Sequence, residues 1–92
     1  MPDKNRIFIA DDDTIALKSL KELLAISGFE VETTGNPAQI LSKVKAFKPQ
    51  LILLDLVMPQ LSGFEICQIL NQDKDTQGIP IIIVSALGNY AD

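Results

Sequence analysis

Three runs of consecutive apolar residues, each leading into a polar side chain, constrain the fold of this chain most strongly. They lie at residues 7–10, 51–54 and 79–84. Because they lack the alternation of a half-exposed strand, they predict strands that are buried on both faces, as in a parallel sheet. Segments with helical periodicity lie between them. This order indicates β-α-β units with helices on both faces of one sheet.

The intervening segments carry start and stop signals for helices. The first predicted helix has Asp13 or Thr14 as its N-cap and ends near Gly28. Its apolar positions are Ile15, Leu17, Leu20, Leu23, Leu24 and Ile26. The second follows Asn36-Pro37 and ends at Lys48-Pro49. Its predicted apolar face consists of Ile40, Leu41, Val44 and Phe47.

A capping box formed by Ser62 and Glu65 opens a third predicted helix. Its expected inner face consists of Phe64, Ile66, Cys67, Ile69 and Leu70, with Phe64 and Phe47 as core residues. Residues 29–33 alternate between apolar and polar, which predicts an exposed or edge strand. The predicted order is β-α-β-α-β-α-β. A chain of 92 residues fits one small α/β domain of this doubly wound, flavodoxin-like type.

Composition excludes several classes of function. The net charge of −4 comes without a basic patch, so we expect no binding to nucleic acid. The absence of histidine excludes histidine-based catalysis and histidine metal sites. The single cysteine, Cys67, excludes an intrachain disulfide and is expected to be a small core residue. No apolar run is long enough to span a membrane, and no signal peptide precedes the first strand, so we expect a cytoplasmic protein.

The polar residues that follow the buried strands are candidates for a site. They are Asp11 and Asp12, then Asp55, then Ser85. In an open α/β sheet, ligands bind beyond the carboxyl ends of the strands, so these residues are expected at one edge. Neighbouring carboxylates repel by roughly 4 kcal/mol per pair at an effective dielectric constant of 20. A hard divalent cation with oxygen ligands, best matched by Mg²⁺, would compensate.

A purely structural explanation accounts for only part of this pattern. Acidic residues at the start of a helix are stabilised by its dipole. This explains Asp13 well and Asp11 and Asp12 less well. It does not explain Asp55, which is distant in sequence.

Three segments together resemble the receiver domain of response regulators, the CheY-like family. They are FIADDD at 8–13, LILLDLVMPQLSGFE at 51–65 and IPIIIVSA at 79–86. The middle segment is the most specific, with an aspartate that ends a strand, Met-Pro three and four residues later, and a glycine eight residues later. The resemblance extends over essentially the whole chain, residues 1–92.

The resemblance implies a phosphoacceptor signalling domain that is not an enzyme. Asp55 would accept the phosphoryl group from a histidine kinase or a phosphotransfer protein, and Ser85 would hydrogen-bond that group. Asp12 and Asp55 would bind Mg²⁺ directly, together with the backbone carbonyl of Val57, and Asp11 would assist through a water molecule. Gly63 would allow the loop after the site to turn, and Pro59 would stiffen it.

The chain also departs from the family pattern. A complete receiver continues with a helix, a fifth strand that ends in a lysine, and a last helix, whereas this sequence stops at Asp92. Lys43, Lys45, Lys48 and Lys74 do not occupy the position of that lysine. We therefore expect a shortened domain without the last α-β-α unit. Its fourth strand would be an exposed apolar edge, which favours a homodimer through that surface.

Two alternatives remain open. The missing lysine favours a receiver-like interaction module that is not phosphorylated. A phosphohydrolase of the haloacid-dehalogenase type also begins with an aspartate after its first strand. The segment Asp11 to Ile15 has isoleucine where that pattern requires threonine or valine, and the chain is short for such an enzyme.

Overall fold

The computed structural model describes residues 5–55 and 62–84 of the chain. It contains four strands, three α-helices and one short 3₁₀ helix in the predicted alternating order. The elements are β1 (Arg6–Ala10), α1 (Thr14–Ile26), β2 (Glu30–Thr34), η1 (Pro37–Gln39), α2 (Ile40–Phe47), β3 (Leu51–Asp55), α3 (Gly63–Gln72) and β4 (Ile81–Val84).

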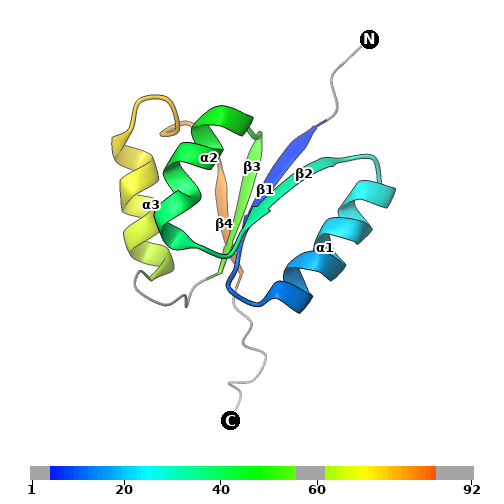
Figure 1. Ribbon diagram of the computed structural model, residues 1–92. Coiled ribbons are helices and arrows are strands. Elements are labelled where there is room, and N and C mark those ends of the chain that lie inside the picture. The colour runs from blue at the N-terminus through cyan, green and yellow to red at the C-terminus, as the bar shows by residue number, and fades with distance from the viewer. Residues whose placement is uncertain (1–4, 56–61, 85–92) are drawn as a thin grey trace.

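The four strands form one parallel sheet in the order β2-β1-β3-β4 (Figure 1). The first strand therefore lies inside the sheet between the second and the third. Ala10 pairs with Leu54, and Asp55 pairs with Val84, so the strands end at the same edge. This confirms the predicted doubly wound fold and the place of β2 at one edge of the sheet.

The two faces of the sheet are covered unequally. Helix α1 lies alone on one face, whereas α2 and α3 lie together on the other (Figure 1). The larger core cluster lies between the sheet and α2 and α3; it consists of Phe8, Ala10, Ile40, Val44, Ile52, Leu54, Ile66 and Leu70. The smaller cluster under α1 has only three fully buried members, Ile7, Ile9 and Leu17. The α1 face is thus the less completely covered one.

Local hydrogen bonds explain where the helices begin and end. The Asp13 side chain accepts hydrogen bonds from the amides of Ile15 and Ala16 and caps α1. The predicted capping box of α3 is present, with Ser62 Oγ accepting from the Glu65 amide and Glu65 accepting from the Ser62 amide. Helix α2 ends at Lys48, whose φ of 53° is left-handed.

Several helical residues that we expected in the core lie at the surface. Phe64 is 67% exposed, and Ile69 is also exposed, so the predicted inner face of α3 is too wide. Only Ile66 and Leu70 of that set are fully buried. On α1, Leu17 alone is fully buried, whereas Ile15, Leu23 and Ile26 are exposed. Cys67 and Phe47 are half-buried and pack against the larger cluster.

Some predicted boundaries are wrong by one or two residues. Strand β2 begins at Glu30 rather than at residue 29, and β4 begins at Ile81, after Pro80. Pro37 opens a 3₁₀ turn before α2, because the Asn36 side chain caps the amide of Ala38.

None of the helices in the described part of the chain has the length and the apolar character that a membrane span requires.

Candidate functional site

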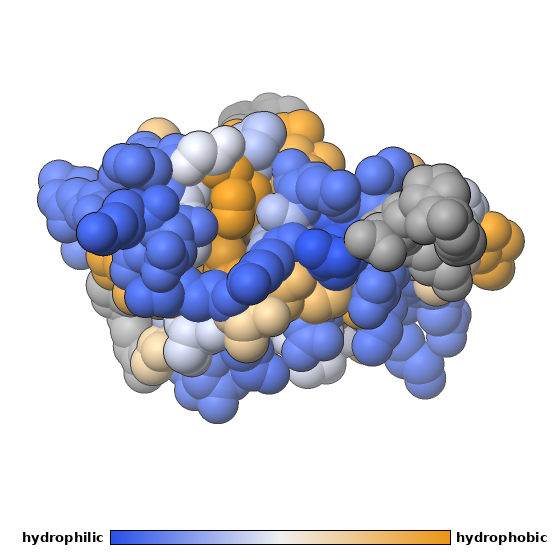
Figure 2. All heavy atoms as spheres, turned by 90° about the horizontal axis from the view of Figure 1, so that it is seen from above, coloured by the Kyte–Doolittle hydropathy of each residue, from blue (hydrophilic) through white to orange (hydrophobic). Residues whose placement is uncertain are grey.

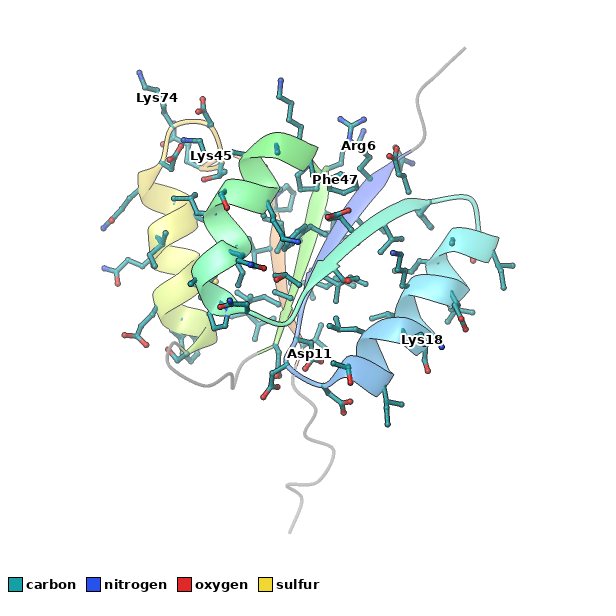
Figure 3. The ribbon with its side chains drawn as sticks, in the orientation of Figure 1. Arg6, Asp11, Lys18, Lys45, Phe47 and Lys74 are labelled. Atoms are coloured by element: carbon teal, nitrogen blue, oxygen red, sulfur yellow. The ribbon has the colours of Figure 1, made fainter. Side chains whose placement is uncertain are left out.

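Three carboxylates meet at the carboxyl ends of the two central strands. Asp11 and Asp12 directly follow β1, and Asp55 is the last residue of β3. Each side chain offers an oxygen that lies within 4.8 Å of the oxygens offered by the other two. Asp11 lies at the lower end of the sheet in Figure 3. The adjacent pairing of β1 and β3 therefore brings together residues that are more than forty positions apart in the sequence.

Hydrogen bonds hold the turn that carries the first two aspartates. The Asp11 amide donates to the Thr34 carbonyl over 3.1 Å, which ties this turn to the end of β2. One Asp11 carboxylate oxygen accepts from the Asp13 amide at 3.0 Å. Asp13 caps α1, as expected for an acidic residue at the start of a helix. Asp11 therefore contributes both to the shape of the turn and to the acidic cluster.

Gly35 is a part of this site that our sequence reasoning missed. A Cβ atom at this position would lie 3.3 Å from the Asp11 carbonyl oxygen and 3.8 Å from the Cα of Asp12. The chain after β2 therefore passes directly against the acidic turn. The available signal was a glycine that follows a strand, which often marks a close approach of backbone.

The three carboxylates differ in their exposure to solvent. Asp55 is only 7% exposed, Asp11 is half-buried and Asp12 is exposed. A small hollow of about 30 Å³ adjoins Asp11 and Asp55, and its other walls are apolar: Ile9, Ala10, Leu20, Leu53, Leu54 and Val84. Burial strengthens the repulsion that Asp55 experiences from its neighbours. A cation that enters from the solvent side of Asp12 would relieve it.

The donor set suits a small hard cation. Mg²⁺ prefers octahedral oxygen ligands at 2.0–2.1 Å, which places two ligand oxygens about 3–4.2 Å apart. Oxygens that lie within 4.8 Å of one another reach such spacings with less than about 1 Å of side-chain adjustment. The cluster contains no histidine or cysteine, the ligands that Zn²⁺ usually takes. The residues present therefore fit Mg²⁺ with additional water ligands.

Other predicted site residues lie outside the part of the chain that the structure describes. These are Val57, Pro59 and Ser85. Gly63 is described, and it is the first residue of α3, where it is buried. Strand β4 ends at Val84, which pairs with Asp55.

Two of the lysines that do not match the family's fifth-strand lysine form ion pairs away from the acidic cluster. Lys45 Nζ lies 3.1 Å from Asp73 and 3.5 Å from Asp75, at the end of the molecule opposite Asp11 (Figure 3). Lys43 lies 4.0 Å from Glu32. The hydrogen bond and charge of Asp73 raise the pKa of Lys45. The Asp75 amide, followed by Lys45, lowers the pKa of Asp73. These contacts join the end of α3 to α2.

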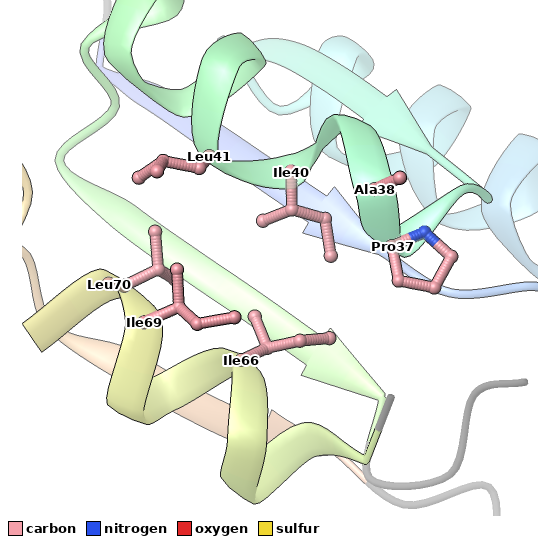
Figure 4. A pocket seen from close by; sticks show the side chains of 7 residues that line it. All are labelled: Pro37, Ala38, Ile40, Leu41, Ile66, Ile69 and Leu70. Atoms are coloured by element: carbon pink, nitrogen blue, oxygen red, sulfur yellow. The ribbon is translucent and has the colours of Figure 1, made fainter. Parts of the chain in front are cut away.

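A second hollow, of about 230 Å³, lies between η1, α2 and α3 (Figure 4). Its lining consists of Pro37, Ala38, Ile40, Leu41, Ile66, Ile69 and Leu70. None of these side chains has a polar group that could bind an ion or a phosphoryl group. The acidic cluster is therefore the stronger candidate for phosphoryl and metal chemistry.

Comparisons with known proteins agree with this geometry. Residues 7–92 match the response regulator receiver domain family. Protein RcaC of Microchaete diplosiphon is 40% identical over 83 residues, which make up 90% of this chain and 13% of RcaC. The DNA-binding response regulator MtrA of Mycobacterium tuberculosis is 33% identical over 89 residues, 97% of this chain and 38% of MtrA. The chain thus spans well under half the length of these curated relatives.

Solved structures show the same fold. A sensor protein from Polaromonas sp. JS666 superposes with a TM-score of 0.86 at 28% identity, over 92% of this chain and 68% of that one. The chemotaxis response regulator CheY4 of Vibrio cholerae has a TM-score of 0.82 at 23% identity, over 88% of this chain and 68% of that one. Together with the match over residues 7–92, these findings show that the chain belongs to the family of response regulator receiver domains, which are signalling domains of two-component systems.

Proposed function

We propose that this chain accepts a phosphoryl group on Asp55 from a histidine kinase or a phosphotransfer protein. The observation that supports this most strongly is the convergence of Asp11, Asp12 and Asp55 at the edge of the central strands, in a chain of the receiver family. A carboxylate nucleophile that forms an aspartyl phosphate is an established type of covalent catalysis. The domain accepts and transmits the group rather than turning over a substrate as an enzyme.

The proposed transfer needs little from the protein beyond position and charge. A carboxylate oxygen of Asp55 bonds to phosphorus while the bond from phosphorus to the donor nitrogen breaks, and the donor leaves with that electron pair. Mg²⁺ bound by Asp12, Asp55 and the Val57 carbonyl would supply neutralisation of the phosphoryl charge. Asp11 would hold a water molecule of the metal, and Ser85 would hydrogen-bond the transferred group. These roles follow from the family resemblance and stay predictions.

A small phosphodonor with Mg²⁺ tests the proposal. The intact mass of the parent chain should increase by one phosphoryl group, and Asp55→Asn should abolish the increase. Asp13→Asn is the matched control, because it removes one charge from a neighbouring residue and asparagine caps helices as well as aspartate does. Phosphorylation of Asp55→Asn, or no phosphorylation of the parent chain with Mg²⁺ present, would contradict the proposal.

The second candidate is a receiver-like interaction module that is not phosphorylated. It is favoured by the positions of Lys43 and Lys45, whose ion pairs with Glu32, Asp73 and Asp75 keep them away from the acidic cluster. The phosphodonor experiment separates the two functions. An unchanged mass, with Asp55→Asn indistinguishable from the parent, would favour the interaction module.

A further inference from the structure

The peptide group that joins Asp11 to Asp12 lies directly against Gly35. A Cβ atom on Gly35 would come within 3.3 Å of the Asp11 carbonyl oxygen and within 3.8 Å of the Asp12 Cα. The first of these distances is shorter than ordinary van der Waals contact, so a side chain here would require a neighbour to move by a few tenths of an ångström. The peptide group that would have to move carries two of the three carboxylates of the acidic cluster.

The acidic turn has little freedom to move away from Gly35. The Asp11 amide donates to the Thr34 carbonyl at 3.1 Å, and the Asp13 amide donates to the Asp11 carboxylate at 3.0 Å. The turn continues directly into α1, where the Asp13 side chain caps the helix and the Leu17 amide donates to the Asp13 carbonyl. A displacement of the turn would therefore strain these hydrogen bonds or move the Asp11 carboxylate.

The loop that carries Gly35 is also held in place. The Thr34 hydroxyl donates to Gln39 Oε1 and accepts from the Asn36 amide, each at 3.2 Å. Asn36 in turn accepts from the amides of Ala38 and Gln39, which fixes the start of η1. Thr34 is only 6% exposed, so breaking its hydrogen bonds would leave polar groups away from water. Movement of this loop would therefore also be costly.

Mg²⁺ is the ion for which such a displacement matters most. It demands near-ideal octahedral geometry with oxygens at about 2.0–2.1 Å, whereas Ca²⁺ accepts about six to eight oxygens at about 2.3–2.6 Å in flexible arrangements. A shift of a few tenths of an ångström exceeds the range of Mg²⁺ distances, which is about 0.1 Å wide. It is close to the range of Ca²⁺ distances, which is about 0.3 Å wide.

We propose that Gly35 is a positioning residue that sets the preference of the acidic site for Mg²⁺ over the larger Ca²⁺. Because Gly35 has no side chain, the peptide group between Asp11 and Asp12 can lie close to the loop after β2 with its carboxylates near Asp55. In the described part of the chain, only Gly28 among the glycines has a positive φ, so the backbone at Gly35 also suits alanine. This role of Gly35 rests on the proposed Mg²⁺ site and requires no phosphorylation.

Gly35→Ala adds the single Cβ atom that would crowd the acidic turn. Urea unfolding at increasing concentrations of MgCl₂ or CaCl₂ gives the metal-free stability and the Kd of each ion, because an ion that binds only the folded chain stabilises it by RT ln(1 + [L]/Kd). Changes to residues that orient metal ligands weaken binding by about 10–100-fold. Since Gly35→Ala removes no ligand, the Kd of Mg²⁺ should rise about tenfold and that of Ca²⁺ about threefold or less.

Gly78→Ala is the matched control, because it makes the same change where a Cβ atom would meet nothing within 4 Å. Gly78 lies in the loop between α3 and β4, at the end of the molecule opposite the carboxyl ends of the strands (Figure 1). Figure 2 views the molecule from that end, where hydrophilic residues cover most of the surface. Gly78→Ala should therefore leave the Kd of both ions unchanged.

The outcomes separate the role of Gly35 from the metal site itself. If Gly35→Ala binds Mg²⁺ as tightly as the parent chain does, the role of Gly35 is refuted and the Mg²⁺ site stands. An equal rise in Kd for Mg²⁺ and Ca²⁺ would also refute it, since a general loosening of the fold weakens both ions alike. A parent chain that binds no Mg²⁺ would refute the proposed site as well.

A measurement on the parent chain does not require the variant to fold. In two-dimensional ¹H–¹⁵N spectra, the amide signal of Gly35 should shift as Mg²⁺ is added, with the Kd found by unfolding, because the peptide group that Gly35 contacts carries carboxylates of the site. The signal of Gly78 should stay in place. A Gly35 signal that does not respond to saturating Mg²⁺ would contradict the proposed coupling.

Discussion

The crowding of Asp55 with two other carboxylates makes a quantitative prediction about stability without metal. Asp55 is 7% exposed, and the oxygens that it and its two neighbours offer lie within 4.8 Å of one another. In the presence of a chelator, no metal ion reduces the repulsion between these three carboxylates. Replacement of Asp55 by asparagine keeps the size of the side chain and removes its charge. We therefore expect Asp55→Asn to be more stable than the parent chain under these conditions.

The size of the effect follows from Coulomb's law. At 4.8 Å, two unit charges repel by about 0.9 kcal/mol in bulk water and about 3.5 kcal/mol at an effective dielectric constant of 20. Asp12 is exposed and Asp55 is buried, so the repulsion in each pair should lie between these values. Two such pairs would repel by about 2–7 kcal/mol in total. Screening by salt and the loss of the interaction that Asp55 makes offset part of this sum, so we expect a net gain of about 1–3 kcal/mol in the free energy of unfolding. For a domain of this size, each kcal/mol raises Tm by about 4–8 °C.

Urea unfolding in the presence of a chelator measures the effect of the repulsion on stability. The same measurement with excess Mg²⁺ gives the stabilisation by the metal. Mg²⁺ at a hundredfold excess over its Kd should stabilise the parent by about 2.7 kcal/mol and should have little effect on Asp55→Asn. Asp13→Asn serves again as the control and should keep the stabilisation by Mg²⁺. If Asp55→Asn is no more stable than the parent in the chelator, the repulsion is absent. If it still gains stability from Mg²⁺, Asp55 is not a ligand.

Three further predictions concern other parts of the chain. Leu70→Ala removes a side chain of the larger core cluster and should lower the free energy of unfolding by about 2–5 kcal/mol. Ile69→Ala, one residue away but exposed, should lower it by about 1 kcal/mol or less. Equal losses for the two variants in urea unfolding would contradict the packing described. The pKa of Asp73 is lowered in the folded chain, so the ionised carboxylate stabilises the fold above the pKa of about 3.9 that aspartate has in the unfolded chain. This stabilisation is lost as the pH falls through the lower pKa of the folded chain. The stability difference between the parent and Asp73→Asn should therefore shrink below about pH 4, and a difference that grows there would refute this sign. Burial raises the pKa of the Cys67 thiol, so alkylation at neutral pH should be slower in the folded chain than in urea, and equal rates would count against that burial.

Much of the fold could be predicted because its signals are local. The uninterrupted apolar runs at 7–10 and 51–54 identify buried strands, and the carboxylates that follow them mark one edge of the sheet. The capping box at Ser62 and the cap at Asp13 place the starts of two helices, because each requires only a few neighbouring residues. The resemblance to the CheY-like family implies a doubly wound parallel sheet, and the observed sheet agrees with it.

Predictions about the burial of helical residues succeeded less well. Periodicity shows which residues of a helix share a face, but it does not show how wide a surface the neighbouring elements can cover. Phe64 and Ile26 follow helical spacing and still lie at the surface. The contact of Gly35 with the acidic turn was also missed, since it joins two loops that are separated by a helix and a strand.

Local signals in the amino-acid sequence were enough to predict the alternation of strands and helices and the acidic residues that follow the central strands. Backbone geometry, side-chain periodicity and capping act over a few residues, so they can be recognised in a single sequence. The packing of the folded chain was needed to show that three carboxylates lie within 4.8 Å of one another and that Phe64 and Ile26 lie at the surface. Both results depend on which strands lie side by side and on how much of each sheet face the helices cover. These are properties of the packed whole, because they arise from contacts between segments that are distant along the chain.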